Sequence, residues 1–127
     1  MKSKTIMLVD DEPSWLDVMT QALEKEPYGV ITADSAEAAM LKLSNKRPDL
    51  ILSDVRMPVT NGFELFEQVR NNPKYQQVPF IFMSSLDDFD ARHTAKVLGA
   101  DGYIEKPFDL NSAKSIIQEL LGRFDLK

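Results

Sequence analysis

The sequence predicts an α/β fold of the (βα)5 type, a doubly wound three-layer sandwich in which helices cover both faces of a five-stranded parallel sheet. The chain has 127 residues, of which 43% are hydrophobic, so it is long enough for one domain with one core. Five short apolar runs alternate with longer amphipathic segments. This alternation is typical of parallel sheets with right-handed crossovers, in which each helix joins two neighbouring strands.

The five apolar runs are the expected strands. They are Ile6–Val9, Gly29–Ala33, Leu50–Leu52, Val78–Met83 and Gly102–Ile104, of which the second is the weakest. Runs this short, and rich in β-branched and aromatic residues, favour strands that are buried on both faces.

Local signals mark the first three helices. Pro13 suits the first turn of a helix, because a backbone nitrogen there has no carbonyl within the helix to which it could donate a hydrogen bond. Ser35 is a suitable N-cap for the second helix. Asn61 followed by Glu64 resembles a capping box at the start of the third.

Two further helices follow. The fourth is expected from near Asp87 to Leu98, with Gly99 as its C-terminal stop. Asp109 can cap the fifth, whose apolar residues recur at spacings of three and four and so form one stripe. We expect residues 1–124 to form the single domain, and residues 125–127 to be a short tail or the start of a linker.

Composition excludes several kinds of function. Fifteen basic and 20 acidic residues give a net charge of −5, which argues against direct nucleic-acid binding by this domain. Without cysteine the chain has no disulfide, thiolate metal site or cysteine nucleophile. The first apolar run is too short for a signal peptide or a membrane span, so a soluble cytoplasmic protein without a membrane partner is expected.

Polar residues stand where four of the apolar runs end. They are Asp10 and Asp11, Asp54, Ser84 and Lys106. The carboxyl ends of parallel strands meet at one sheet edge, so these side chains should converge there. Three carboxylates brought together repel one another and need a cation, and oxygen ligands favour Mg²⁺. A carboxylate beside Mg²⁺ is a feasible nucleophile towards a phosphoryl group, and lysine and serine can pair with the added charge.

These motifs resemble the receiver domain of two-component response regulators, from about Thr5 to Phe124. The matching residues, in chain order, are Asp10-Asp11, Asp54-Val55-Arg56-Met57-Pro58, Gly62, Ser84, Tyr103 and Lys106-Pro107. The resemblance implies the flavodoxin-like version of the predicted fold, with strand order 2-1-3-4-5.

The resemblance also implies a chemistry for the acidic residues. Asp54 is then the phosphoacceptor, and Asp10, Asp11 and Asp54 hold Mg²⁺, with Mn²⁺ as an alternative ion. The backbone carbonyl of Arg56 would be a further metal ligand, and Lys106 would contact the phosphoryl group. The domain would be a phosphorylated signalling domain and no enzyme, apart from at most slow autophosphatase activity.

The family further implies a switch and its partners. Ser84 would contact the phosphoryl group and form the switch together with Tyr103, and the bond before Pro107 would be cis. The donor would be a histidine kinase or a histidine phosphotransfer protein. The fourth helix, fifth strand and fifth helix would bind a downstream effector, and a phosphorylation-dependent dimer is a further expectation.

Some positions depart from the commonest family pattern or vary within it. Ser84 replaces the more frequent threonine, and Ser85 stands where alanine or glycine is usual. Arg56 and Leu86 occupy two variable positions, so we expect an altered autodephosphorylation rate.

Several alternatives remain open at this point. The chain can be a receiver domain excised from a larger regulator or a hybrid histidine kinase. A phosphatase that forms an aspartyl phosphate, a nucleotide- or flavin-binding domain, and a degenerate receiver acting only by interaction are weaker hypotheses. No G-x-G-x-x-G or Walker sequence supports the nucleotide site. Tyr103 as a plain core or surface aromatic is also open.

Overall fold

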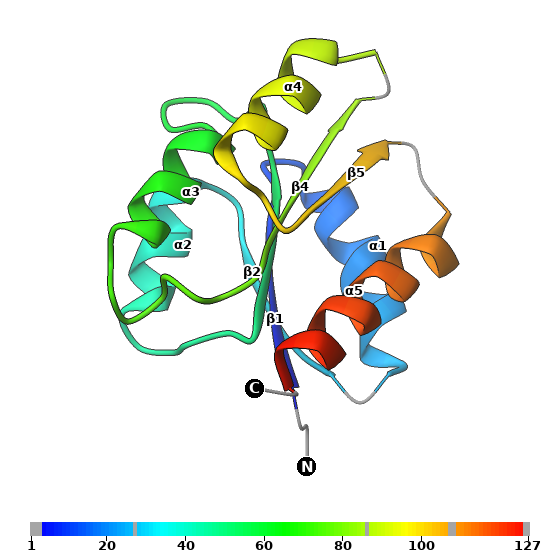
Figure 1. Ribbon diagram of the computed structural model, residues 1–127. Helices are drawn as coiled ribbons and strands as arrows, with labels where there is room; N and C mark the ends of the chain where they lie inside the picture. The colour runs from blue at the N-terminus through cyan, green and yellow to red at the C-terminus, as the bar shows by residue number, and fades with distance from the viewer. Residues whose placement is uncertain (1–3, 27, 86, 107–108, 126–127) are drawn as a thin grey trace.

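A computed structural model describes residues 4–26, 28–85, 87–106 and 109–125, and these form a central parallel sheet between two layers of helices (Figure 1). The strands are β1 (Lys4–Val9), β2 (Tyr28–Ala33), β3 (Leu50–Asp54), β4 (Phe80–Ser85) and β5 (Gly102–Lys106). Their order is β2-β1-β3-β4-β5, and every neighbouring pair is parallel. The predicted fold class and strand order are therefore confirmed.

Helices cover both faces of this sheet, as Figure 1 shows. The helices are α1 (Pro13–Glu24), α2 (Ala36–Leu43), α3 (Gly62–Arg70), α4 (Phe89–Leu98) and α5 (Leu110–Asp125). The first and fifth pack on one face, and α2, α3 and α4 on the other, which gives two separate apolar layers. Within the described residues, none of these helices has the length and apolar character that a membrane crossing requires.

The local signals act where the sequence predicts. The Ser35 hydroxyl accepts a hydrogen bond from the Ala38 amide at 3.0 Å. Asn61 and Glu64 form a complete capping box, in which each side chain accepts from the other residue's amide. Gly99 ends α4 with a φ of 81°, a conformation that costs glycine little.

Strand bounds differ slightly from the apolar runs. The fourth strand begins at Phe80 instead of Val78, because the Val78 amide closes a turn onto Tyr75 and Pro79 has no amide hydrogen. At the other end the strands extend past their apolar runs, so that Asp54 and Lys106 are the last residues of β3 and β5. Asp54, Ser84 and Lys106 are thus held by paired strands, whereas Asp10 and Asp11 directly follow the end of β1.

Candidate functional site

The polar residues at the strand ends lie at one edge of the sheet. Three carboxylates from this edge, those of Asp10, Asp11 and Asp54, each offer an oxygen within 4.8 Å of the others. Asp10 directly follows β1, and β3, which ends in Asp54, pairs alongside β1. The convergence expected from the sequence is therefore present in the structure.

The two adjacent aspartates have different environments. Asp10 has no exposed surface, and its carboxylate accepts a hydrogen bond from the Glu12 amide at 3.0 Å. Asp11 is exposed. A buried carboxylate needs a partner for its charge, whereas an exposed one can keep water around it. The pair thus offers one enclosed and one open ligand.

Lys106 supplies the opposite charge. Its Nζ atom lies 2.7 Å from Asp10 Oδ2 and 3.8 Å from Asp54 Oδ1. This contact links the last residue of β5 to the residue that follows β1, and β3 and β4 lie between these two strands in the sheet. The ammonium group also lies 5.0 Å from the centre of the Trp15 ring, a favourable cation–π position. Trp15 therefore helps to hold the lysine over the acidic cluster.

The Asp54 carboxyl is perturbed by this environment. Burial raises its pKa, the Lys106 ammonium lowers it, and the charges of Asp10 and Asp11 raise it again, so that the pKa is about 6. Only 8% of Asp54 is exposed. The negative form is thus disfavoured, and a hard divalent cation between the three carboxylates would stabilise it. The oxygen-only ligands and the open side at Asp11 fit Mg²⁺, which keeps several waters when bound.

The backbone of Asp54 is packed closely against the start of α3. The Gly62 amide donates to the Val55 carbonyl at 2.9 Å, and a Cβ atom on Gly62 would lie 2.3 Å from the Asp54 carbonyl oxygen. Only glycine fits at this distance. The glycine eight residues after the aspartate therefore serves to bring the helix against the predicted phosphoacceptor.

Ser84 is positioned by a group that the sequence analysis did not identify. The serine is 2% exposed, and its hydroxyl donates to Asp88 Oδ2 at 3.0 Å. Arg56 donates to both carboxylate oxygens of Asp88 at 2.9 Å, and holds the pKa of that carboxyl well below its usual range, at about 2. Asp88 also caps α4, because its Oδ1 accepts from the Ala91 amide at 3.2 Å. The predicted helix starts near Asp87, so the sequence did not single out Asp88 as the cap, and no local signal pointed to its contact with Ser84.

The side chain of Arg56 therefore binds Asp88, whereas its backbone carbonyl as a metal ligand stays a prediction. Tyr103 pairs in register with Phe82, two residues before Ser84 on the same strand, and packs against the apolar layer on the side of α4. Among the described residues its buried hydroxyl has no hydrogen-bond partner. The predicted cis bond before Pro107 lies outside the described residues.

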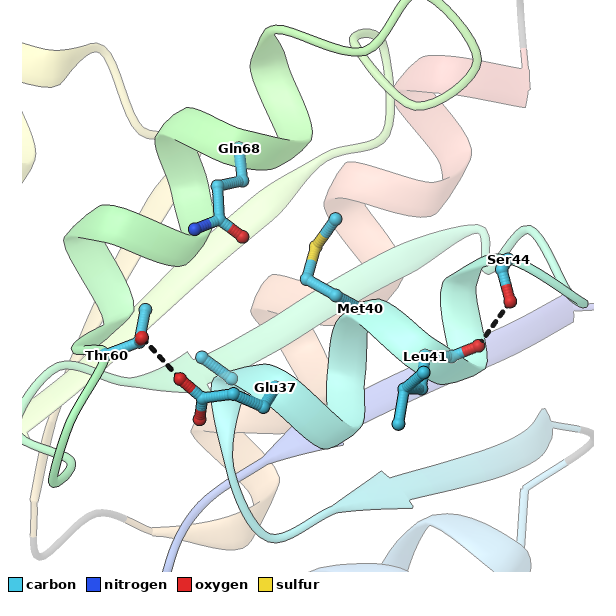
Figure 2. Close-up of a pocket in the computed structure, with 7 residues that line it drawn as sticks. Glu37, Met40, Leu41, Ser44, Thr60 and Gln68 are labelled. Atoms are coloured by element: carbon cyan, nitrogen blue, oxygen red, sulfur yellow. Dashed lines mark hydrogen bonds between the residues drawn. The ribbon is translucent and has the colours of Figure 1, made fainter.

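A hollow of about 340 Å³ lies elsewhere, between α2 and α3. Figure 2 shows Met40 and Gln68 on its opposite sides, with Glu37 bonded to Thr60 at one end. None of the residues that line it is a predicted site residue. The strand-end edge therefore remains the candidate site.

Comparison with known proteins agrees with this geometry. The family model described as the response regulator receiver domain matches residues 6–118. The alkaline phosphatase synthesis transcriptional regulatory protein PhoP of Bacillus subtilis is 32% identical over 98% of this chain, which covers 51% of that protein. Across similar regulators the chain spans about half of the relative's length or less.

Solved structures are similar over nearly the whole chain. The signal receiver domain of a signal transduction histidine kinase from Syntrophus aciditrophicus is 30% identical, with a TM-score of 0.88 and coverage of 94% of this chain and 91% of that one. The receiver domain of a sensor histidine kinase from Pseudomonas aeruginosa is 27% identical, with a TM-score of 0.85 and coverage of 94% and 98%. In that structure a magnesium ion is coordinated in the active-site cleft.

Proposed function

The chain belongs to the response regulator receiver domain family, and we propose that it accepts a phosphoryl group on Asp54 from a phosphohistidine donor. The observation that carries this proposal is the set of three carboxylates within 4.8 Å of one another, with the Lys106 ammonium 2.7 Å from one of them. A receiver needs a carboxylate nucleophile, a place for a cation and a fixed positive charge, and this edge offers all three.

We propose that Asp10, Asp11 and Asp54 hold Mg²⁺, with Mn²⁺ as an alternative ion and the Arg56 carbonyl as a further ligand. When bound, the ion supplies positive charge that offsets the repulsion among the carboxylates and the phosphoryl oxygens. The match of ligands to ion rests on the donor set, and the magnesium in the Pseudomonas aeruginosa receiver supports it.

In the proposed transfer, one carboxylate oxygen of Asp54 forms a bond to phosphorus. The bond between phosphorus and the donor's imidazole nitrogen breaks, and the imidazole keeps the electron pair of that bond. Lys106 then pairs with a phosphoryl oxygen, for which its position 3.8 Å from Asp54 Oδ1 is suitable. The chain's only histidine, His93, is exposed on α4, so no histidine base stands beside the acceptor. The phosphoryl group should therefore be held, with at most slow self-hydrolysis.

The proposed readout runs through Ser84 and Tyr103 to a face formed by α4, β5 and α5, where an effector would bind. Tyr103 of β5 is in register with Phe82 of β4, and the Arg92 guanidinium of α4 lies 5.9 Å from the centre of its ring. Its buried hydroxyl has no hydrogen-bond partner among the described residues, and these observations support a route from the strand end to α4. Tyr103→Ala should accept phosphate normally but lose the amide chemical-shift changes on α4 that beryllofluoride, a phosphoryl mimic, causes in the wild type. Tyr103→Phe, which keeps the ring, is the control. If beryllofluoride changed the α4 amide shifts of Tyr103→Ala as much as those of the wild type, this route would be excluded.

A second part of the proposal concerns the larger protein in which this domain would work and its phosphoryl donor. Because the chain covers about half of its regulator relatives, we propose that it works as the receiver part of a larger regulator or a hybrid histidine kinase. A histidine kinase or phosphotransfer protein would be its donor. Its net charge of −5 gives no support to nucleic-acid binding by the domain itself.

Incubation with acetyl phosphate and Mg²⁺ tests the proposed function. Intact-mass spectrometry should show one added phosphoryl group per chain that persists after the donor is removed, and none in Asp54→Asn or with a chelator. Release of inorganic phosphate over many turnovers without an adduct would instead support a phosphatase.

A further inference from the structure

Asp88 holds together three parts of the molecule that must move relative to one another if the domain is a switch. Its carboxylate accepts from the Ser84 hydroxyl at the end of β4, from the Arg56 guanidinium in the loop after β3, and from the Ala91 amide in the first turn of α4. We refer to these three contacts as the Asp88 network. Only 14% of the Asp88 side chain is exposed, so water does not easily replace its partners.

The Ser84 hydroxyl has one hydrogen to donate, and in this structure it donates it to Asp88. A phosphoryl group on Asp54 would need the same hydrogen. Arg56 stands two residues from Asp54 with 64% of its side chain exposed, so once it releases Asp88 it can turn towards the added charge. Both partners of Asp88 are therefore groups that an aspartyl phosphate would attract.

We propose that Asp88 is a positioning residue that withholds the Ser84 hydroxyl from the phosphoryl site, so that phosphorylation has to break the Ser84–Asp88 contact. This inference rests on the proposed function of Asp54. The same carboxylate caps α4, so the contact that is broken connects the phosphoryl site directly to the helix of the proposed effector face. Asp88 and the phosphoryl group thus compete for the Ser84 hydrogen. The strength of the Ser84–Asp88 contact sets how strongly the unphosphorylated state is favoured, and so how tightly a phosphoryl mimic binds.

Asp88→Asn separates this role from the helix cap. Asparagine caps helices about as well as aspartate, and its carbonyl oxygen can still accept from the Ala91 amide. Its amide group can only donate towards Ser84, which leaves the serine hydrogen available to a phosphoryl oxygen. Asp90→Asn is the matched control, because Asp90 lies in the same first turn and carries the same charge, but is exposed.

The binding of beryllofluoride with Mg²⁺ measures the competition. The chain's single tryptophan, Trp15, lies 5.0 Å from the Lys106 ammonium and should report binding by its fluorescence. Asp88→Asn should bind the mimic about three- to tenfold more tightly than Asp90→Asn, which is the ratio expected for one competing hydrogen bond. In a Ser84→Ala background the advantage of Asp88→Asn over Asp90→Asn should shrink, since the contested hydroxyl is gone and only the release of Arg56 remains.

The outcomes separate this inference from the proposed function. Equal affinities of Asp88→Asn and Asp90→Asn with Ser84 present would overturn the role of Asp88, while leaving Asp54 as the phosphoacceptor. A tighter Asp88→Asn that stays equally tighter in the Ser84→Ala background would assign the effect to charge or fold, and would overturn it as well. No binding by the wild-type protein, in fluorescence or by calorimetry, would overturn both proposals.

Discussion

Gly62→Ala perturbs the closest backbone approach at the site. In the structure a Cβ atom at this position would lie 2.3 Å from the Asp54 carbonyl oxygen and 3.0 Å from the Val55 Cα atom. Both are backbone atoms, which cannot turn away as the end of a side chain can. The start of α3 or the end of β3 has to move by roughly 1 Å to restore an ordinary contact.

The expected change in the free energy of unfolding follows from a comparison with Gly122. That residue lies in α5, and a Cβ atom there would meet nothing within 4 Å. Both substitutions reduce the freedom of the unfolded chain equally, by about 0.4–1 kcal/mol, so their difference reports the folded state alone. We expect Gly122→Ala to raise the free energy of unfolding by about 0.5–1 kcal/mol. Gly62→Ala should lower the free energy of unfolding by about 2 kcal/mol. Overpacking typically costs about 1–3 kcal/mol, and backbone atoms yield less easily than side chains.

Urea unfolding of the wild type and the two variants, followed by circular dichroism, checks this difference. Phosphorylation by acetyl phosphate gives a second readout, since the strain falls on the backbone that carries the Asp54 side chain. Equal stabilities of Gly62→Ala and Gly122→Ala would refute the close approach and, with it, the reason for glycine eight residues after the aspartate.

Two further predictions concern strain and charge. Val59 is a β-branched residue with a φ of 68° and is 93% exposed. In thermal unfolding Val59→Gly should therefore be more stable than the wild type by about 0.5–1 kcal/mol. Val59→Ala keeps the Cβ atom and should gain less. The folded-state pKa of Asp54, about 6, lies above the ordinary value of 3.8, so its ionisation weakens the fold as the pH rises from about 4 to about 6. With a chelator present, Asp54→Asn should therefore be more stable than the wild type by about 3 kcal/mol at pH 8 and no more stable at pH 4. Saturating Mg²⁺ should remove the gain at pH 8. A gain that is the same at both pH values would contradict this account of the carboxyl group.

The fold was predictable because its determinants are local. Pro13, Ser35, Asn61 with Glu64, and Gly99 each mark a helix end by a rule that involves only a few neighbouring residues. Topology then follows, since alternating strands and helices with right-handed crossovers leave few arrangements. The convergence of Asp10, Asp11 and Asp54 follows from the topology in turn, because parallel strands end at one edge.

What the sequence could not predict depends on distance in space. Asp10 and Asp11 are neighbours in the chain, yet one is fully buried and the other exposed, and only the packing of the strand end decides which. The sequence alone does not single out Asp88. Its contact with Arg56, 32 residues away, appears only when two loops meet at the same edge. The raised pKa of Asp54 likewise requires knowing how deeply the carboxyl lies.

The central claim is that Asp54 itself carries the phosphoryl group, and locating that group tests it most directly. Borohydride reduces an acyl phosphate but leaves free carboxylates and phosphate esters intact, so it marks the modified residue permanently. After incubation with acetyl phosphate and Mg²⁺, peptide sequencing by tandem mass spectrometry should find the reduced residue at position 54 and nowhere else. A mark on Asp10 or Asp11, or phosphate on Ser84 or His93 with Asp54 unmodified, would contradict the account.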